Sequence, residues 1–484
     1  MSDRPKVPDP KQLELLRGAV AQLAPVLPLL QELGKRFEQH GHEIALVGGP
    51  VRDAFLGRTS PDLDFTTDAS PDESLAAVEG WADTHWDIGR EFGTIGLRRD
   101  QHHIEITTYR ADTYDRTSRK PEVMFGDTLD GDLVRRDFTV NAMAIRLPSL
   151  EFVDLHGGLA DLAARRLTTP APPEESFADD PLRMMRAARF AAQLGFDVAS
   201  DVRVAMTERA ATLEIVSAER IRDEFTKLVC APSPRPGLAL IVDTGLADHF
   251  IPELPALRLE VDEHHRHKDV YEHSLTVLEQ AIAQETDGPD LILRLAALLH
   301  DIGKPATRRF EPGGGVSFHH HELVGARLAS KRLKALRYDK TVVKAVARLV
   351  ELHLRFHGYG EGQWTDSAVR RYVTDAGPLL QRLHRLTRSD STTRNVRKAQ
   401  RLSLAYGDLE QRIERLAAEE ELAAVRPELN GNEIAEVLGI KPGPVLGEAY
   451  TYLLSVRLDD GPIGKDAARE KLLAWWAERS HTVR

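Results

Sequence analysis

The stretch LVGGPVRDAFLGRTSPDLDF, residues 46–65, decides the architecture of the N-terminal part of the chain. An apolar, strand-like run ends in Gly48 and Gly49, and a second strand-like segment carries Asp62 and Asp64. Because side chains alternate along a strand, these two carboxylates are expected on the same face of the sheet. Carboxylate oxygens suit Mg²⁺, and such a pair can hold metal ions around a triphosphate for phosphoryl transfer.

The two glycines between the strands predict a place where phosphate can approach the backbone. Glycine has no side chain to obstruct a ligand, and the first turn of the following helix offers unpaired N–H groups. Arg52 in that helix is expected to add a charge-assisted contact. In the later strand HIEITTYR, residues 103–110, Glu105 is either a third carboxylate beside the metal or a structural residue, and Arg110 is expected to contact phosphate.

Outward from this stretch, the pattern predicts an α+β protein. Short apolar runs alternate with turns between residues 44 and 147, as strands of a small mixed α/β domain do. ESLAAVEGWADTH, residues 73–85, reads as a helix within it, and the polar residues 112–132 read as a mobile loop. From about residue 156 onward nearly everything reads as helical, apart from a linker predicted at LTTPAPPEESFADDP, residues 167–181.

Composition restricts the class of protein. A chain of 484 residues suggests roughly two to four domains. One cysteine excludes an intrachain disulfide and an all-cysteine metal site. The start lacks the layout of a signal peptide, and no stretch approaches about 18 uninterrupted apolar residues. We therefore expect a cytoplasmic enzyme with no membrane contact and no obligate protein partner.

The net charge of −11 argues against a nucleic-acid partner, but basic residues gather locally. Phosphate contacts need only a basic stripe. One stripe comprises Arg183, Arg186, Arg189, Arg220 and Arg222, and a second comprises Arg382, Arg385, Arg388, Arg394, Arg397, Lys398 and Arg401. Either stripe alone is equally well explained as a solvated helix face.

The glycine turn followed by D-x-D resembles the active-site motif of class II tRNA nucleotidyltransferases and bacterial poly(A) polymerases, within the DNA polymerase β superfamily. RRDFTVNAMAI, residues 135–145, resembles the motif that handles ribose and phosphate in that family. Asp137 can accept a hydrogen bond from a ribose 2′-hydroxyl, and Asn141 offers both a donor and an acceptor. Arg135 and Arg136 are expected to neutralise the triphosphate.

A further motif offers a way to choose a base without a template. In DDPLRMMRAARF, residues 179–190, Asp180 and Arg183 are expected to be neighbours on one helical face. A carboxylate accepts from the exocyclic amine of cytosine or adenine, while a guanidinium donates to the adjacent ring nitrogen. The resemblance implies that this pair reads the incoming base. Arg186 and Arg189 are expected to meet phosphates, and ERIRDEF, residues 219–225, to support the helix structurally.

The segments DVYEHSLTVLEQA, residues 269–281, and LAALLHDIGKPATR, residues 295–308, contain a His and a later His-Asp pair. Together with a distant Asp, they resemble the HD superfamily of metal-dependent phosphohydrolases. The resemblance implies a metal site, in which Asp390 is the best choice for the last ligand; the four expected ligands are His273, His300, Asp301 and Asp390. His321 with Glu322, and His353, could complete a second site. Imidazole and carboxylate ligands suit several transition metals. The alternative is a helical RNA-binding body whose hydrolase activity is vestigial.

The resemblance divides the chain into N-terminal helices (1–40), a nucleotidyltransferase head (41–155), a helical neck (156–255), an HD-type body (256–400) and a helical tail that grips tRNA (401–484). It implies addition of C, C and A to tRNA from CTP and ATP. In this mechanism Asp62 and Asp64 bind two Mg²⁺ ions, which activate the RNA 3′-hydroxyl and clamp the triphosphate. The alternatives are a poly(A) polymerase, an enzyme adding only part of the end, an HD phosphohydrolase with a non-catalytic head, and an RNA-binding adaptor.

Overall fold

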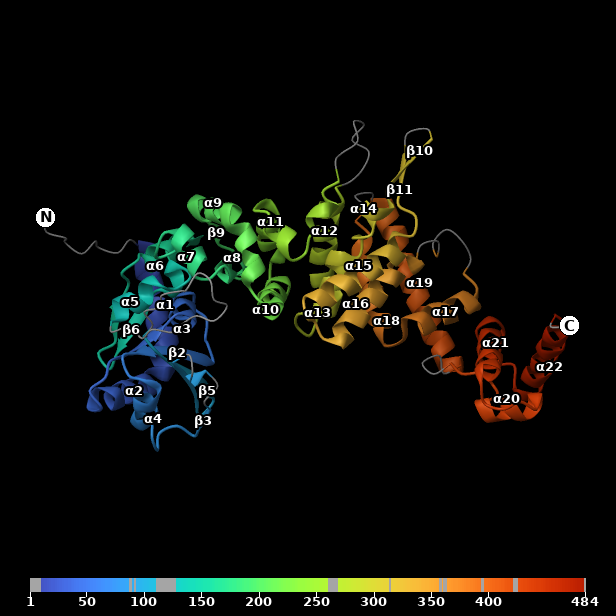
Figure 1. The fold of residues 1–484 in the computed structure, drawn as a ribbon, viewed down its shortest axis with the longest axis horizontal. Coiled ribbons are helices and arrows are strands. Elements are labelled where there is room, and N and C mark those ends of the chain that lie inside the picture. Colours follow the sequence, from blue (N-terminus) through green and yellow to red (C-terminus); the bar gives the residue numbers. More distant parts are fainter. Residues whose placement is uncertain are drawn as a thin grey trace. The chain divides into compact units, whose positions relative to one another are not determined.

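The computed structural model describes residues 10–86, 89–90, 93–109, 128–259, 269–312, 315–356, 359, 364–392, 396–420 and 425–482. The chain forms two compact units, Met1–Pro252 and Glu253–Arg484 (Figure 1). A mixed sheet lies in the first unit, and the remainder is mostly helical. The α+β class expected from the sequence is confirmed.

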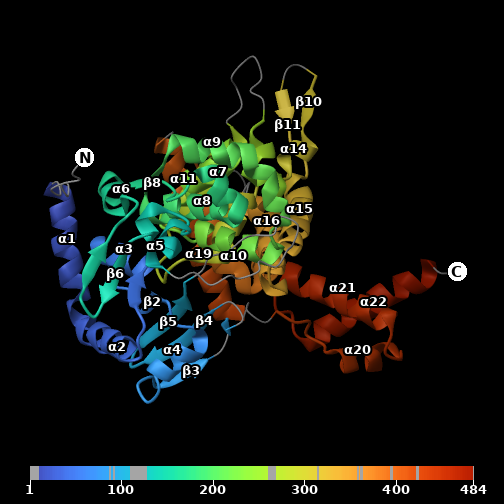
Figure 2. The same ribbon diagram turned by 60° about the vertical axis from the view of Figure 1, so that its left-hand side comes forward.

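The first unit is built on a seven-stranded sheet with the strand order β3-β4-β5-β2-β1-β6-β7. Its strands are β1 (Ile44–Val47), β2 (Asp62–Thr67), β3 (Thr84–Trp86), β4 (Thr94–Arg99), β5 (His102–Thr108), β6 (Ala144–Leu147) and β7 (Glu151–Val153). Strands β2 and β5 pair in parallel, whereas the other neighbours are antiparallel. Figure 2 shows α4 beside β5, β4 and β3.

Helices pack around this sheet and fix its central strands. They are α1 (Pro10–Leu23), η1 (Ala24–Val26), α2 (Leu27–Gln39), α3 (Gly49–Phe55), α4 (Pro71–Ala77), α5 (Leu129–Val134), η3 (Thr139–Asn141) and α6 (Gly158–Ala164). Every residue of β1 is buried, as expected for a strand in the middle of a covered sheet. In β2, Leu63 and Phe65 point into the core while Asp62 is exposed, so the predicted alternation is present.

Two local predictions are wrong. The helix expected over residues 73–85 ends at Ala77, because Gly80 adopts a φ of +69° and the chain turns into β3. The linker expected over residues 167–181 contains α7 (Pro173–Asp179), whose Phe177 is fully buried. Proline in the first turn followed by acidic residues is a helix-start signal that outweighs the high proline content.

The rest of the first unit is helical and centres on α8 (Leu182–Leu194). Its other elements are β8 (Arg166–Leu167), β9 (Asp197–Val198), α9 (Ser200–Arg209), η4 (Ala210–Ile215), α10 (Ala218–Val229), α11 (Pro234–Asp243) and η5 (Leu246–His249). A Cβ at Gly237 of α11 would lie 2.3 Å from the carbonyl oxygen of Ala188, so glycine permits the close packing of α11 on α8. Helix α8 ends before Gly195, whose φ of +67° is a conformation that favours glycine at a helix end.

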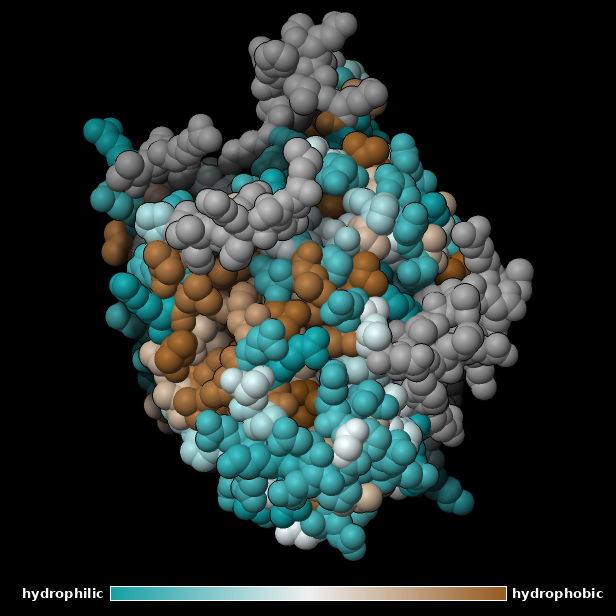
Figure 3. Space-filling view, turned by 90° about the vertical axis from the view of Figure 1, so that its left-hand side faces the viewer, coloured by the Kyte–Doolittle hydropathy of each residue, from teal (hydrophilic) through white to brown (hydrophobic). Residues whose placement is uncertain are grey.

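The N-terminal stretch Pro10–Gln39 is long and apolar enough to cross a membrane by length and composition alone. It is not one continuous α-helix, because η1 interrupts it at Ala24–Val26. Helix α2 buries Leu30, Leu33 and Phe37 completely, whereas Val20 of α1 is exposed. Figure 3 shows apolar side chains gathered on one face of this unit.

The second unit is helical and ends in a separate small bundle. Its larger part comprises η6 (Pro255–Leu257), α12 (Val270–Ile282), α13 (Leu291–Leu299), α14 (Lys304–Thr307), the hairpin β10 (Arg309–Glu311) and β11 (Gly315–Ser317), α15 (His321–Ala335), α16 (Lys340–Leu352), η7 (His353–Phe356), α17 (Asp366–Ala376), η8 (Gly377–Leu379), α18 (Leu380–Asp390) and α19 (Val396–Glu420). Helix α19 runs across the boundary that was predicted at residue 400.

The C-terminal bundle has a hydrophobic core of its own. It consists of α20 (Gly431–Leu438), α21 (Pro444–Asp460) and α22 (Lys465–Thr482). Its core residues are Leu429, Ile434, Ala449, Leu453, Ala468 and Leu472. Helix α20 is short, whereas α21 continues for 17 residues.

Candidate functional site

Three carboxylates gather on the solvent-facing side of β2 and β5. Asp62 and Asp64 lie at the start of β2, and Glu105 of β5 stands directly opposite Asp64 in the parallel register. Burial, followed by the neighbouring charges of Glu105 and Asp62, raises the pKa of Asp64 to about 6. A divalent cation would relieve this repulsion, so the donor set fits Mg²⁺. Of the two alternatives for Glu105, its position favours the one beside the metal.

Gly48 brings the backbone close to this carboxylate cluster. Its φ of +72° suits glycine, and a Cβ there would lie 3.1 Å from Nη1 of Arg136 and 4.0 Å from Oδ2 of Asp64. Gly49 begins α3, in which Arg52 is buried and lies near enough to the cluster for its charge to oppose the raised pKa of Asp64. There, Nη1 of Arg52 donates to Oδ1 of Asn141 at 2.7 Å. The turn thus joins the D-x-D strand to the residues of the RRD motif.

Asp137 of that motif forms the centre of a buried network. Its Oδ1 accepts from the backbone N–H of Phe138 at 2.8 Å and from Nδ2 of Asn141 at 2.9 Å. Its Oδ2 accepts from Nε of Arg186 at 2.7 Å. Burial opposes the charge of Asp137, but Arg186 and the bond from Asn141 outweigh it and lower the pKa to about 2. In this arrangement the carboxylate links the motif to α8.

The arginines expected to meet phosphate are engaged inside the protein. Nε of Arg189 donates to Oε2 of Glu224 at 2.6 Å, and Nη1 of Arg186 lies 3.8 Å from Oε1 of Glu224. Glu224 comes from α10 and is buried. These pairs tie α8 to α10, which agrees with a supporting role for residues 219–225. Arg110 and most of the loop predicted at 112–132 lie outside the described residues.

Asp180 and Arg183 do not share a helix, contrary to the sequence prediction. Asp180 is extended, with φ −144° and ψ 100°, and follows α7, whereas Arg183 lies in the first turn of α8. Oδ2 of Asp180 pairs with Nη2 of Arg220 at 2.9 Å. Nη1 of Arg183 donates to Oγ of Ser176 at 2.8 Å. Sequence reasoning missed both partners, because 40 residues separate Arg220 from Asp180 and Ser176 lay in a predicted linker.

The expected HD ligands meet inside the second unit. The side chains form two groups that could each hold a metal ion: His273, His300 and Asp390, and Asp301, His321 and His353. Asp301 falls in the second group, but its Oδ2 also lies 3.2 Å from Nε2 of His300 and 3.7 Å from Nε2 of His273. Asp301 therefore stands between the two groups. Glu322 belongs to neither group.

The orientation of the histidine rings in the HD cluster fits a metal centre. The buried Nε2 atoms of His300, His321 and His353 make no well-aligned hydrogen bond, although oxygens of Asp301 lie 3.2 Å from the first two, an arrangement that normally requires an explanation such as an ion. Their Nδ1 atoms meet backbone carbonyls at 2.6–2.8 Å, which orients each ring as metal-bound histidines are oriented. Burial and the charge of His300 lower the pKa of His353 to about 4. Burial lowers the pKa of His300, but Asp301 and Asp390 outweigh burial and raise it to about 10, so a metal ion bound there would displace a proton.

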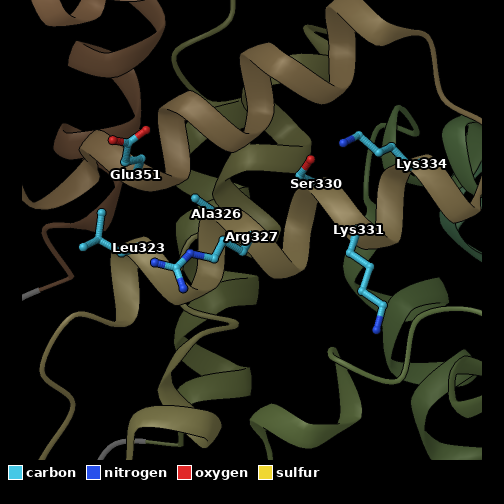
Figure 4. A pocket seen from close by; sticks show the side chains of 7 residues that line it. All are labelled: Leu323, Ala326, Arg327, Ser330, Lys331, Lys334 and Glu351. Atoms are coloured by element: carbon cyan, nitrogen blue, oxygen red, sulfur yellow. The ribbon is translucent and has the colours of Figure 1, made fainter.

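A surface depression of about 640 Å³ lies away from these ligands, on α15 and α16. Figure 4 shows Arg327, Lys331 and Lys334 extending from α15 along it. None of the HD ligands lines this depression.

The second basic stripe is partly neutralised, because Arg382 pairs with Asp290 and Arg388 with Glu410.

Three models of known protein families match successive segments of the chain. Residues 44–168 match the poly A polymerase head domain, and residues 195–257 match the probable RNA and SrmB-binding site of polymerase A. Residues 270–395 match the HD domain. The three matches follow the same order as the sheet, the helices after it and the histidine cluster.

Whole-chain relatives agree with these matches. The A-adding tRNA nucleotidyltransferase of Deinococcus radiodurans is 34% identical over 90% of this chain and 96% of its own. The CC-adding tRNA nucleotidyltransferase of Thermus thermophilus is 33% identical over 89% and 93%, respectively. The CCA-adding enzyme of Levilactobacillus brevis is 40% identical over 46% of this chain and 56% of its own.

A solved structure shares the fold over nearly the whole length. The CCA-adding enzyme of Bacillus stearothermophilus, solved in complex with CTP, aligns with a TM-score of 0.67 over 95% of this chain and 99% of its own, at 23% identity. The family-model matches and the whole-chain relatives establish the assignment beyond the fold. The chain belongs to the class II CCA-adding and poly(A) polymerase family, as a tRNA nucleotidyltransferase that carries an HD domain.

Proposed function

We propose that this protein adds C, C and A to the 3′ end of tRNA, using CTP and ATP and no template. The carboxylate cluster of Asp62, Asp64 and Glu105 supports this proposal most directly, because it provides oxygen ligands next to an open glycine turn. A single active site with one base-reading pair would serve both nucleotides. Cytosine and adenine present the same amine beside an acceptor nitrogen.

The protein's own groups would bind and orient the nucleotide. Asp62 and Asp64 would hold Mg²⁺, which supplies charge neutralisation to the triphosphate and activation to the attacking hydroxyl. Arg136, 3.1 Å from the position of a Cβ on Gly48, lies where it can neutralise phosphate charge beside the carboxylates. Asp180 would accept a hydrogen bond from the base, and Arg183 would donate one to it. Asp137 and Asn141 remain the proposed ribose contacts, and their internal bonds would have to be shared or exchanged for them.

Incomplete end addition is a specific second candidate. Two relatives that align over about nine-tenths of the chain are named for adding A or CC. The CCA-adding enzyme of Levilactobacillus brevis aligns over about half of this chain at a higher identity, so similarity does not decide which nucleotides are added. Poly(A) synthesis is the remaining alternative within the family.

Three acceptor tRNAs separate these activities. The first acceptor lacks the whole CCA sequence, the second ends in its first C and the third ends in CC. Each is incubated with all four NTPs and Mg²⁺, and the products are sequenced. The proposal predicts that all three finish in CCA and then stop. Extension of the third acceptor alone would identify an A-adding enzyme. Arrest at CC would identify a CC-adding enzyme, and a long A tract would identify a poly(A) polymerase.

We also propose that the HD cluster binds a divalent transition metal and hydrolyses phosphoesters at RNA ends. The three buried Nε2 atoms, which converge with the carboxylates of Asp301 and Asp390, carry this second proposal. Lys304 donates to Oδ2 of Asp301 at 2.6 Å and provides a cation beside the ligands. The test is metal content by mass spectrometry together with hydrolysis of 2′,3′-cyclic phosphates. Metal-free protein with no hydrolysis after metal addition would leave the region a helical RNA-binding body.

The remaining assignments complete the proposal. The division at residues 40, 155, 255 and 400 is retained as a functional one, although α19 bridges the last boundary. The bundle of α20, α21 and α22 has its own core and is proposed as the element that grips the tRNA body. A cytoplasmic location and the absence of an obligate protein partner belong to the same proposal.

A further inference from the structure

We propose that Ser176 and Arg220 are positioning residues that orient the base-reading pair Asp180 and Arg183 and thereby help decide which nucleotide is added. This inference rests on the proposed function of the pair and adds two residues to it. Neither residue belongs to the pair itself, and each contacts one of its members directly.

The carboxylate of Asp180 is held through both oxygens. Nη2 of Arg220 donates to Oδ2 at 2.9 Å, and the backbone N–H of Leu182 donates to Oδ1 at 3.1 Å. A carboxylate has about four acceptor positions, so about two remain for a ligand. Because Asp180 is extended and lies outside a helix, no helical geometry fixes its side chain. The two bonds supply that orientation instead.

The guanidinium of Arg183 is held by hydrogen bonds to Ser176 and Arg135. Nη1 donates to Oγ of Ser176 at 2.8 Å and to its carbonyl oxygen at 3.2 Å, while Nη2 donates to the carbonyl oxygen of Arg135 at 2.5 Å. These three bonds leave two of the five N–H donors of a guanidinium for a nucleobase. Ser176 is buried, and its hydroxyl lies next to a cation rather than solvent.

The contact with Arg135 also connects the base-reading pair to the RRD motif. Arg135 precedes Arg136 and Asp137, the residues proposed for phosphate and ribose. Selection of a base by hydrogen bonds needs donors and acceptors held to a fraction of an ångström by their surroundings. Loosening either partner should let the pair rotate, so that the bases it now excludes find acceptable contacts.

The test measures kcat and KM for CTP and UTP on a tRNA that lacks its 3′ end. Ser176→Ala removes only the hydroxyl, and loss of a hydrogen bond to a charged group should reduce CTP-over-UTP discrimination about tenfold. Arg220→Gln breaks a half-exposed pair and should reduce it about threefold. Both effects should appear as a higher KM for CTP with kcat within about twofold of the wild-type value. Arg220→Lys retains the charge and should recover part of the discrimination.

Matched controls separate orientation from general damage. Ser74→Ala removes a buried hydroxyl that has no hydrogen-bond partner, and Arg222→Gln removes a cation from the same helix as Arg220. Neither control should change discrimination. Thermal unfolding of each variant would show whether the fold is retained, and Arg220→Gln tests the idea at a surface position if Ser176→Ala fails to fold.

The result that overturns the proposal is unchanged discrimination in folded Ser176→Ala and Arg220→Gln protein. If Asp180→Ala and Arg183→Ala relax discrimination in the same experiment, the pair reads the base without help from these partners. If all four variants discriminate as the wild type does, the proposed reading pair itself is wrong. The two failures are therefore distinguishable.

Discussion

Protonation of Asp64 should control how tightly Mg²⁺ binds to the head. The pKa of Asp64 is raised from 3.8 to about 6 by burial and by Glu105 and Asp62. At pH 5 about nine in ten molecules would therefore carry the proton, against about one in ten at pH 7. Because the metal binds the deprotonated carboxylate, its affinity should fall about tenfold for each pH unit below 6.

The same shift has a defined sign for stability. Without metal, the folded protein binds the proton more tightly than the unfolded chain does. The free energy of unfolding should therefore fall as the pH rises from about 4 through 6, by up to about 3 kcal/mol. Asp64→Asn removes the charge, so the variant should lose this pH dependence and be the more stable protein at pH 8.

Calorimetric Mg²⁺ titrations between pH 5 and pH 8, in buffers with different ionisation enthalpies, measure both affinity and proton release. Wild-type protein should release about half a proton per bound ion near pH 6 and almost none at pH 8. Asp100→Asn is the matched control, since Asp100 lies at a turn where φ is +53° and asparagine is tolerated. Proton release that is the same at every pH, or unchanged in Asp64→Asn, would refute the reasoning.

Three further predictions concern the glycine turn, the buried network and the HD cluster. Gly48→Ala should lower the rate of nucleotide addition at least tenfold, because its Cβ would press on Arg136. Gly57 has a similar φ of +70° but no atom within reach of a Cβ, so Gly57→Ala should lower only stability. Equal rates of addition for the two variants would contradict this. Glu224→Gln should lower the free energy of unfolding of the first unit by about 3 kcal/mol, because it leaves the charge of Arg189 uncompensated. Denaturant unfolding measures this change, and an unchanged unfolding midpoint would contradict it. His353→Ala should lower the metal content and any phosphoester hydrolysis while tRNA end addition continues at the wild-type rate; loss of both activities would make the cluster structural.

Local pattern was sufficient to predict the carboxylate pair. Alternation in the segment DLDF places Asp62 and Asp64 on the exposed face and Leu63 and Phe65 in the core, which the structure confirms. The role of Glu105 could not be predicted in the same way. Only the parallel register between β2 and β5 places it opposite Asp64, and strand register is a property of the assembled sheet.

Contacts between distant segments account for most of what the sequence did not reveal. Arg186 and Arg189 lie on an arginine-rich helix and read as phosphate ligands, but buried Asp137 and Glu224 already engage them. No local feature of either segment indicates such a partner. Ser176 is a different case, because proline followed by acidic residues did signal the start of the helix that positions it.

The HD ligands were predictable as a set but not in their grouping. The resemblance to the HD superfamily implies that His273, His300 and Asp390 approach one another, and the structure places them in one group. It also places Asp301 with His321 and His353, although Oδ2 of Asp301 lies 3.2 Å from Nε2 of His300. The position of Asp301 between the two groups depends on how the helices pack, which a motif alone does not show.

The rate of CMP addition by Asp64→Ala, measured on a tRNA that lacks its 3′ end and compared with the wild-type rate, tests the central claim most directly. The carboxylate cluster accounts for catalysis if the variant loses about 1000-fold in rate, equivalent to about 4 kcal/mol of activation free energy, while tRNA binding persists. Addition at a rate within tenfold of the wild type would contradict the assignment of catalysis to Asp62 and Asp64.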